Sequence, residues 1–348
     1  MNDTEFKVAT EQRLQAFLEI QKANALTPAA AEMIGRLEQL ILRAGKRSRP
    51  RLLKLTYDAY GGKHPEIVVD IGLALELQHQ FLLVHDDIMD NDTVRYNGLN
   101  MLGYYRQEFP QGVTTIAESM ALMAGNLLFT FANQVILEHP DLTPEQKLAV
   151  LHILHETNLA VHAGQQLDIV NVLALQPSIT EETLLRTDFL KTALYSVRQP
   201  MVVAAELVGL KSAERKKIDA FARAFGILYQ LVDDFSDYFS NSSSFDDHPK
   251  YRDYRQGKIT YPLLYGLEHG TTEDVKHLRD NAARKNLTDE EMEQIAERLE
   301  KIGAKTAAQQ QIKRYYGDAI QALDALAIDK TARDSLLGML AAFSGIGR

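Results

Sequence analysis

Two acidic clusters with the same spacing constrain this chain more than any other feature, because each ends a long, almost wholly apolar segment. They read Asp86-Asp87-Ile88-Met89-Asp90 and Asp233-Asp234-Phe235-Ser236-Asp237. In a helix the first and last carboxylates of each cluster share one face and repel each other, and the carboxyl end of a helix disfavours negative charge. One such cluster could be a solvated helix end, whereas two copies predict a bound cation. Clustered oxygen ligands in a chain without cysteine favour Mg²⁺, held by carboxylates and substrate phosphates.

The hydrophobic pattern predicts an all-α fold. Helical periodicity recurs at residues 14–20, 71–84, 120–137, 148–169 and 221–239, without sustained strand alternation. The low number of turn formers, 20 glycines and 10 prolines in 348 residues, agrees with this prediction. Several of these helices are apolar around most of their circumference, which is typical of helices in the middle of a bundle. We expect breaks at 60–65, 96–112, 139–144 and 241–256, none of which resembles an interdomain linker.

The charge and the absence of cysteine limit the partners and the compartment. A formal net charge of −9 argues against nucleic acid or an anionic membrane as the main partner, since both require a basic face. A chain without cysteine suits a reducing compartment. Residues 1–12 are polar and lack the apolar run of a signal peptide, and the most apolar stretch, 121–137, contains two asparagines and a glutamine. We therefore expect a soluble, cytoplasmic protein without stable membrane insertion.

Polar side chains on the same helices extend the predicted site. His79 lies seven residues before Asp86 and eleven before Asp90, and at 100° per residue the three directions agree within about 20°. Gln230 lies three residues before Asp233, also on one face. A lone His or Gln on an apolar helix is more often a satisfied core residue than a ligand. Their alignment with the acidic clusters favours the site.

Basic residues occur in short runs that could bind a polyanion beside the metal. They are Gly45-Lys46-Arg47-Ser48-Arg49-Pro50-Arg51, Arg95, Lys191-Thr192 and Gly257-Lys258-Ile259-Thr260-Tyr261-Pro262. Taken singly, each is best explained as a solvated charge. Lys191 fits that explanation least, because most of its neighbours from Phe189 to Tyr195 are apolar. Together with the acidic clusters, these runs predict a diphosphate substrate.

At these residues the sequence resembles a known family, the trans-isoprenyl diphosphate synthases, also called polyprenyl synthetases. The resemblance covers residues 45–262 and keeps the motifs in the order of the family. Besides the basic runs, the motifs are Glu76-Leu77-Gln78-His79 leading into His85-Asp86-Asp87-Ile88-Met89-Asp90, Gly164-Gln165-Gln166-Leu167-Asp168, and Tyr229-Gln230-Leu231-Val232-Asp233-Asp234-Phe235-Ser236-Asp237, with Asp253 before Gly257. One DDxxD motif alone would be weak evidence, whereas the ordered set is specific.

The resemblance implies a single all-α domain over residues 1–348, a helical bundle around a deep central cavity, and a homodimer. It also implies a role for each matching residue. Asp86, Asp90, Asp233 and Asp237 would hold Mg²⁺, as three ions with substrate bound; Arg95, Lys191 and Lys258 would contact the allylic diphosphate; Lys46, Arg49 and His79 would hold isopentenyl diphosphate; and Gln165 would contact substrate. Motifs from residue 45 to residue 258 must then meet around one cavity, which favours one domain over the two that the length alone allows.

The implied reaction is the Mg²⁺-dependent head-to-tail condensation of isopentenyl diphosphate with an allylic diphosphate (dimethylallyl, geranyl or farnesyl). Charge builds on the leaving diphosphate as the allylic carbon–oxygen bond breaks, so cations fixed there stabilise the transition state more than the ground state. Thr192 and Gln230 are suited to stabilise the allylic cation without reacting with it. The released diphosphate is the expected base for the final proton.

Product length is set, in the family, by side chains below the first acidic motif. Phe81 lies five residues before Asp86, about 7.5 Å down the helix at 1.5 Å per residue, and Leu82 stands beside it. A large aromatic residue there would block a growing tail, which favours a fifteen- or twenty-carbon product. Two alternatives stay open: Phe81 packs only in the core, or the enzyme makes medium- or long-chain products for quinone side chains.

Two departures from the family pattern affect the predicted contacts. Tyr96 replaces the second of two adjacent arginines, so that the binding site for isopentenyl diphosphate loses one positive charge. Weaker binding is expected, or compensation by Arg47, Arg51 or Arg106. After the second acidic motif, Pro249-Lys250 stands at a shorter spacing than the usual Gly-Lys pair.

Two rival functions are less consistent with the motifs. A class I terpene cyclase shares the first DDxxD motif but typically has a different second metal motif and needs no isopentenyl site. A regulatory subunit of a two-component synthase would not need two intact acidic motifs.

Overall fold

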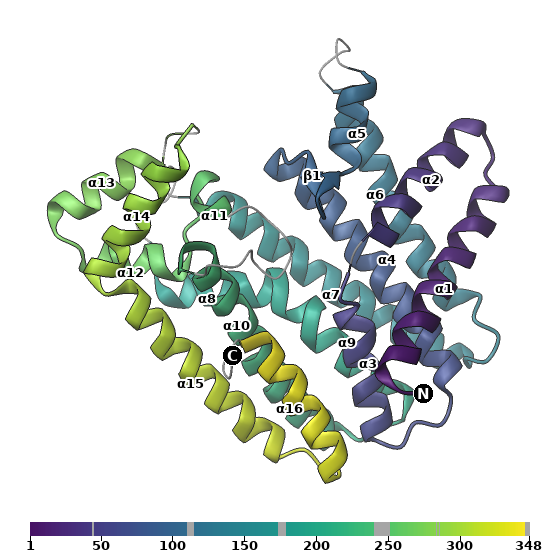
Figure 1. Cartoon of the computed structure of the whole chain (residues 1–348). Coiled ribbons are helices and arrows are strands. Elements are labelled where there is room, and N and C mark those ends of the chain that lie inside the picture. Colours follow the sequence, from purple (N-terminus) through teal and green to yellow (C-terminus); the bar gives the residue numbers. More distant parts are fainter. Residues whose placement is uncertain are drawn as a thin grey trace. The chain divides into compact units, whose positions relative to one another are not determined.

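The structure is a computed structural model that describes residues 1–43, 45–109, 115–172, 179–239, 251–282, 284 and 286–344. Helices make up nearly all of it (Figure 1), which confirms the predicted all-α class. The contacts within the chain divide it into two compact units. Unit 1 comprises Met1–Ile153 and Val203–Leu210, and unit 2 comprises Leu154–Val202 and Lys211–Arg348. The single domain and its central cavity stay predictions.

Unit 1 is built around one buried helix. Its elements are α1 (Asp3–Ala23), α2 (Pro28–Arg43), α3 (Ser48–Ala59), α4 (Pro65–Asp90), β1 (Val94–Arg95), β2 (Gly98–Leu99), α5 (Met101–Glu108) and α6 (Ile116–Leu137). Helix α4 packs most extensively against α6 and also contacts α3 and α1 (Figure 1). Leu73, Leu77 and Val84 of α4 are almost fully buried, so that α4 supplies the centre of this core.

The ends of α4 follow from local sequence and bring the first acidic cluster to its last turn. Pro65 occupies the first turn, where its missing N–H costs nothing. Asn91 ends the helix in the left-handed conformation (φ 61°), and its N–H donates to the carbonyls of Asp87 and Ile88. The carboxylates from Asp86 to Asp90 therefore lie at the carboxyl end of the helix, as predicted.

Unit 2 is built around α10. Its elements are α8 (Glu181–Asp188), a π-helix η1 (Phe189–Arg198), α10 (Ser212–Phe239), α11 (Arg252–Arg255), α12 (Tyr261–His269), α13 (Thr272–Ala282), α14 (Asp289–Ile302), α15 (Ala304–Asp324) and α16 (Lys330–Ser344). Helix α10 packs mainly against α15 and η1. The boundary between the units passes through α7 (Pro144–Val170) and α9 (Gln199–Leu207).

The predicted break at 96–112 is wrong in part, because it contains a short hairpin strand and helix α5. Val94 pairs with Leu99 and Arg95 with Gly98 across the turn. Asn100 then caps α5, since its Oδ1 accepts the N–H of Gly103 at 2.8 Å. Met101, Leu102 and Tyr105 are buried, so tertiary packing stabilises a helix that local periodicity does not predict.

Two helices in the described part of the chain, α4 and α6, are long and apolar enough to cross a membrane by length and composition alone. In α4, 89% of the apolar window is buried inside the structure, as in a core helix. In α6 the share is 44%, so that this helix exposes much of an apolar surface.

Candidate active site

The first acidic cluster is held by a buried ion pair that the sequence did not indicate. The Arg95 guanidinium on β1 donates to Asp87 Oδ1 from Nη2 at 2.6 Å and from Nε at 3.0 Å. Both side chains are at most 2% exposed, while Asp86 is 18% exposed and lies 4.0 Å from Arg95 Nη2. Asp90 is half-buried in the same turn. The central carboxylate is therefore a structural anchor, and the outer two remain accessible.

Three arginines gather around His79 within unit 1. Burial, followed by the positive charges of Arg49, Arg95 and Arg47, holds the pKa of His79 well below its usual range. His79 lies on α4, Arg49 in the first turn of α3, and Arg95 on β1. The structure thus brings together three of the residues that were predicted to bind diphosphate. A neutral imidazole among guanidinium groups adds hydrogen bonding without adding charge.

The three arginines that could compensate for the arginine replaced by Tyr96 are each bound to a carboxylate. Arg47 Nη1 donates to Glu76 Oε1 at 2.7 Å, Arg51 Nε donates to Asp3 Oδ2 at 2.7 Å, and Arg106 pairs with Glu118. Tyr96 itself is half-buried and takes up a left-handed conformation (φ 52°). Compensation for this tyrosine stays a prediction, and the departure at Pro249-Lys250 lies outside the described residues.

The two residues predicted to set product length point to different sides of α4. Phe81 is 5% exposed, and its ring contacts those of Phe129 on α6 (centroids 5.0 Å apart) and His85 (4.7 Å). Leu82 is half-buried and lies four residues before Asp86, which places it on the same helix face as that carboxylate. Phe81 thus belongs to the core between α4 and α6, so that a role in product length would be additional to packing.

The second acidic cluster is largely buried. Burial and the neighbouring Asp253 raise the pKa of Asp234 to about 7 and that of Asp237 to about 8. Asp234 accepts hydrogen bonds from the Gln230 amide at 2.9 Å and the Tyr261 N–H at 3.0 Å. Asp237 Oδ1 accepts the N–H of Arg252, but its Oδ2 accepts no hydrogen bond from the described residues. Asp233 is half-buried.

Lys191 and Lys258 meet at one carboxylate. Lys191 Nζ donates to Asp168 Oδ2 at 2.6 Å, and Lys258 Nζ lies 3.4 Å from the same oxygen. Asp168 belongs to the Gly164–Asp168 motif, yet sequence reasoning gave it no role. Gln165 and Thr192 are half-buried on α7 and η1. The structure therefore brings both predicted lysines together within unit 2.

Asp188 was missed because nothing in its sequence context indicates a site. It precedes the apolar Phe189 at the end of α8. Burial, then the charges of Asp234 and Asp168, raises the pKa of Asp188 well above its usual range. The charge of Asp253 likewise raises the pKa values of Asp234 and Asp237. Asp188 and Asp253 thus enlarge the acidic cluster around the two lysines.

The π-helix that carries Lys191 and Thr192 packs closely on two glycines. A Cβ on Gly164 would lie 2.4 Å from the Lys191 backbone N, and a Cβ on Gly226 would lie 2.3 Å from Ala193 Cβ. Close backbone approach from α7 and α10 therefore fixes the segment that presents Lys191.

We expect Gly164→Ala to destabilise the protein by about 1–3 kcal/mol, because overpacking forces backbone shifts, and to lower turnover by moving Lys191. Gly317→Ala on α15 is the matched control, since nothing lies within 4 Å of its added methyl group. Denaturant unfolding and turnover are measured for both variants. Equal stability and turnover in the two would contradict the packing argument.

The donor set fits Mg²⁺. Among the described residues, no three or more His, Asp or Glu side chains form a group that could hold a metal by themselves. Mg²⁺ commonly takes only one or two carboxylates and completes its octahedron with substrate phosphates and water. Burial and the neighbouring Asp253 raise the pKa values of Asp234 and Asp237, and a bound cation would stabilise these carboxylates because its charge would offset theirs.

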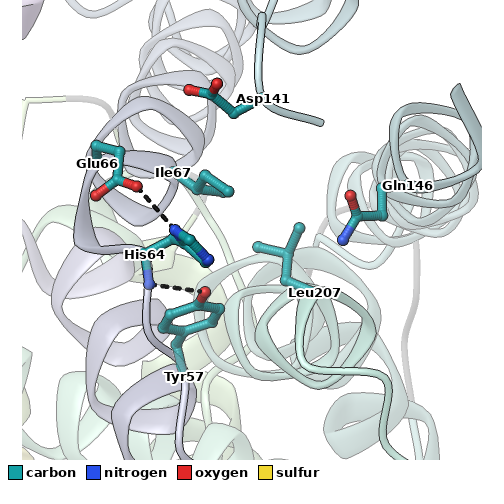
Figure 2. A pocket seen from close by; sticks show the side chains of 7 residues that line it. All are labelled: Tyr57, His64, Glu66, Ile67, Asp141, Gln146 and Leu207. Carbon is teal, nitrogen blue, oxygen red and sulfur yellow. Dashed lines mark hydrogen bonds and ion pairs between the residues drawn. The ribbon is translucent and has the colours of Figure 1, made fainter. Parts of the chain in front are cut away.

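A separate cavity of about 360 Å³ lies in unit 1 near the amino-terminal end of α4 (Figure 2). Two contacts of His64 lie in the wall of this cavity. Its Nδ1 lies 3.1 Å from Glu66 Oε1, and its backbone N–H donates to the Tyr57 hydroxyl at 3.3 Å. The lining residues are Tyr57, His64, Glu66, Ile67, Asp141, Gln146 and Leu207. None of them is a predicted site residue, and Glu66 lies 20 residues before Asp86, about 30 Å along α4. Its acidic walls disfavour a diphosphate.

Comparisons with known proteins identify the family of this chain. The polyprenyl synthetase family profile matches residues 31–299. The short chain isoprenyl diphosphate synthase of Methanothermobacter thermautotrophicus is 30% identical over 241 residues, which cover 69% of each chain. The octaprenyl diphosphate synthase of Escherichia coli is 27% identical over 296 residues, which cover 85% of this chain and 84% of that protein.

A solved structure shows the same fold. The geranylgeranyl pyrophosphate synthase of Corynebacterium glutamicum, in complex with isoprenyl diphosphate and magnesium, superposes with a TM-score of 0.90 at 22% identity and covers 99% of both chains. The profile match over most of the sequence, together with the isoprenyl synthase relative at 30% identity, shows that this chain belongs to the polyprenyl synthetase family of prenyltransferases.

Proposed function

We propose that this protein condenses isopentenyl diphosphate head-to-tail with an allylic diphosphate and releases diphosphate. The observation that best supports the proposal is the buried carboxylate cluster of α10 beside two lysines. Asp234 and Asp237 have raised pKa values, and Lys191 and Lys258 converge on Asp168. Carboxylates suited to a divalent cation, next to fixed ammonium groups, are what an allylic diphosphate requires as its carbon–oxygen bond breaks.

The cofactor of the proposed reaction is Mg²⁺, with Asp86, Asp90, Asp233 and Asp237 as ligands and three ions per site when substrate is bound. When bound, Mg²⁺ neutralises charge on the diphosphate and so makes it a better leaving group. The Corynebacterium protein was solved with magnesium and isoprenyl diphosphate, which supports Mg²⁺ as the cofactor.

Separate residues serve the two substrates in this proposal. Arg95, Lys191 and Lys258 bind the allylic diphosphate, Thr192 and Gln230 stabilise the allylic cation, and Gln165 contacts substrate. Lys46, Arg49 and His79 bind isopentenyl diphosphate. The low pKa of His79 keeps its imidazole neutral, so that it can donate one hydrogen bond to a phosphate oxygen and leaves the positive charge to the arginines. The released diphosphate takes the final proton.

The proposed product has fifteen or twenty carbons, because Phe81 places an aromatic ring about one and a half helical turns below Asp86. A longer product is the second candidate, and the similarity to an octaprenyl diphosphate synthase favours it. Phe81 and the half-buried Leu82 are the residues that decide between the two.

We also propose a cytoplasmic homodimer that forms through the exposed face of α6. Leu122 is 47% exposed and Met123 is 55% exposed, and no charged residue occurs between Glu118 and Glu138. Large uncharged apolar faces on soluble proteins mark contact sites. The exposed polar side chains of Asn126 and Thr130 interrupt this face, and the Asn126 amide would lack a hydrogen-bond partner in lipid, which favours a protein partner.

A charge placed on this face tests the dimer. Met123→Glu is expected to convert a dimer into a monomer, because an unpaired carboxylate would be buried in the interface. Sedimentation equilibrium gives the mass, and Lys147→Glu, which adds negative charge on the neighbouring α7, is the control. A wild-type monomer, or a Met123→Glu dimer as tight as the wild type, would contradict this interface.

The function itself is tested by incubating the purified chain with isopentenyl diphosphate and each of the three allylic diphosphates in the presence of Mg²⁺. Mass spectrometry of the products identifies their length. A prenyl diphosphate is the expected product. A cyclic hydrocarbon would indicate a terpene cyclase, and no product from the chain alone would indicate a regulatory subunit.

A further inference from the structure

The turn that carries Lys46 and Arg49 is folded around the side chain of Arg47. Arg47 is 4% exposed and takes up a left-handed backbone conformation (φ 48°) just before α3. Its guanidinium folds back over Gly45, where an added Cβ would lie 2.8 Å from Arg47 Nη1. Arg47 Nη2 also donates to the Ile41 carbonyl at 2.8 Å, which ties the turn to the end of α2.

Glu76 on α4 is the buried anchor of this arginine. Its Oε1 accepts Arg47 Nη1 at 2.7 Å, and the two side chains are 4% and 3% exposed. The Gln80 amide donates to the same oxygen at 3.2 Å and fixes the orientation of the carboxylate. Glu11 on α1 lies 3.6 Å from Arg47 Nε at the solvent side. A buried charge pair with additional hydrogen bonds holds its partners in one geometry.

The position of Glu76 links this anchor to the diphosphate-binding residues. Glu76 precedes His79 by three residues, so that both side chains leave α4 on the same side. His79 is close enough to Arg49 and Arg47 for their charges to act on it. Arg47 therefore points inward to Glu76, while Lys46 is exposed and Arg49 approaches His79.

We propose that Glu76 and Arg47 are positioning residues for isopentenyl diphosphate. They do not touch this substrate, and they hold the 45–49 turn so that Lys46 and Arg49 reach its diphosphate. This inference rests on the proposed function. In this proposal Arg47 acts through the turn and does not itself replace the arginine that is missing at Tyr96.

The test compares Glu76→Gln and Arg47→Lys with Asp70→Asn. Gln keeps the shape of Glu76 without its charge, and Lys keeps the charge of Arg47 but cannot bind Glu76 and the Ile41 carbonyl as a fork. Asp70 is the matched control, since it lies on α4 and accepts Arg13 Nε of α1 at 2.5 Å. Steady-state kinetics are measured for each substrate separately, together with thermal unfolding.

We expect Glu76→Gln and Arg47→Lys each to raise KM for isopentenyl diphosphate by about tenfold or more, since small displacements of charged groups weaken binding strongly. We expect kcat and KM for the allylic substrate to change by less than about threefold. The double variant should be no worse than the more affected single variant, because both changes disrupt one contact. Asp70→Asn should leave both KM values unchanged.

Two results would overturn the proposal. One is an unchanged KM for isopentenyl diphosphate in both variants. The other is an equal rise in KM for both substrates that follows the fall in unfolding temperature and also occurs in Asp70→Asn. Such a result would mean that Glu76 and Arg47 only stabilise the fold.

Calorimetric titration with inorganic diphosphate in Mg²⁺-free buffer separates this inference from the proposed function. If the wild type binds diphosphate and makes no product, the proposed function fails. The positioning role is then still tested, because it predicts that Glu76→Gln binds diphosphate more weakly than the wild type. Equal affinity in wild type and variant would refute that role.

Discussion

Asp86→Ala and Asp233→Ala are each expected to lower turnover by about three orders of magnitude or more. Removal of a single group that stabilises transition-state charge commonly costs about 10²–10³, and each of these carboxylates is a proposed Mg²⁺ ligand. Asp86 is 18% exposed and Asp233 half-buried, so that their loss should leave the helices intact. Steady-state turnover at saturating Mg²⁺ and circular dichroism check both expectations.

Matched controls lie on the same helices. Asp70→Ala removes a carboxylate from α4 that binds Arg13, and Asp219→Ala removes one from α10 that pairs with Arg198. Both controls should keep turnover within about threefold, because Asp70 and Asp219 lie about four turns before the acidic clusters of their helices. Near-normal turnover of Asp86→Ala and Asp233→Ala at saturating Mg²⁺ would remove the metal assignment.

Phe81→Ala is expected to lengthen the products by at least one isoprene unit. The change opens space beside Phe129 and below the first acidic motif, where a growing tail would otherwise meet an aromatic ring. Because Phe81 is 5% exposed, the variant should also lose about 3–5 kcal/mol of stability. Products are identified by mass spectrometry at a temperature at which the variant stays folded.

Phe131→Ala provides the control for the lost core volume. Phe131 is also 5% exposed and lies on α6, but its ring contacts Phe17 of α1. It should lose comparable stability without a change in product length. An unchanged product distribution in Phe81→Ala would leave Phe81 with a packing role only, and Leu82→Ala would then test the remaining candidate.

Much of the fold was predictable, because long apolar segments with helical period form helices wherever they are buried. Residues 71–84 fall within α4, 120–137 within α6, and 221–239 within α10, as predicted. Helix α5 was not predictable in this way. It depends on the Asn100 cap and on burial of Met101 and Leu102 by other elements.

The candidate site was predictable in its residue types and less so in its contacts. The sequence indicated the DDxxD clusters but not which carboxylate is buried. Asp87 is buried because Arg95, on the strand that follows the helix, binds it. Asp168 became apparent only as the shared partner of Lys191 and Lys258. The π-helix around Lys191 likewise depends on close approach of Gly164 and Gly226, both distant in sequence.

We expect this chain alone to join isopentenyl diphosphate to an allylic diphosphate with Mg²⁺. The most direct measurement incubates the purified protein with both substrates, with Mg²⁺ or with excess chelator, and quantifies prenyl diphosphate and released diphosphate. We predict equimolar release of diphosphate for each isopentenyl unit added, and none with chelator. Diphosphate release without chain elongation, or elongation that persists in chelator, would contradict the account.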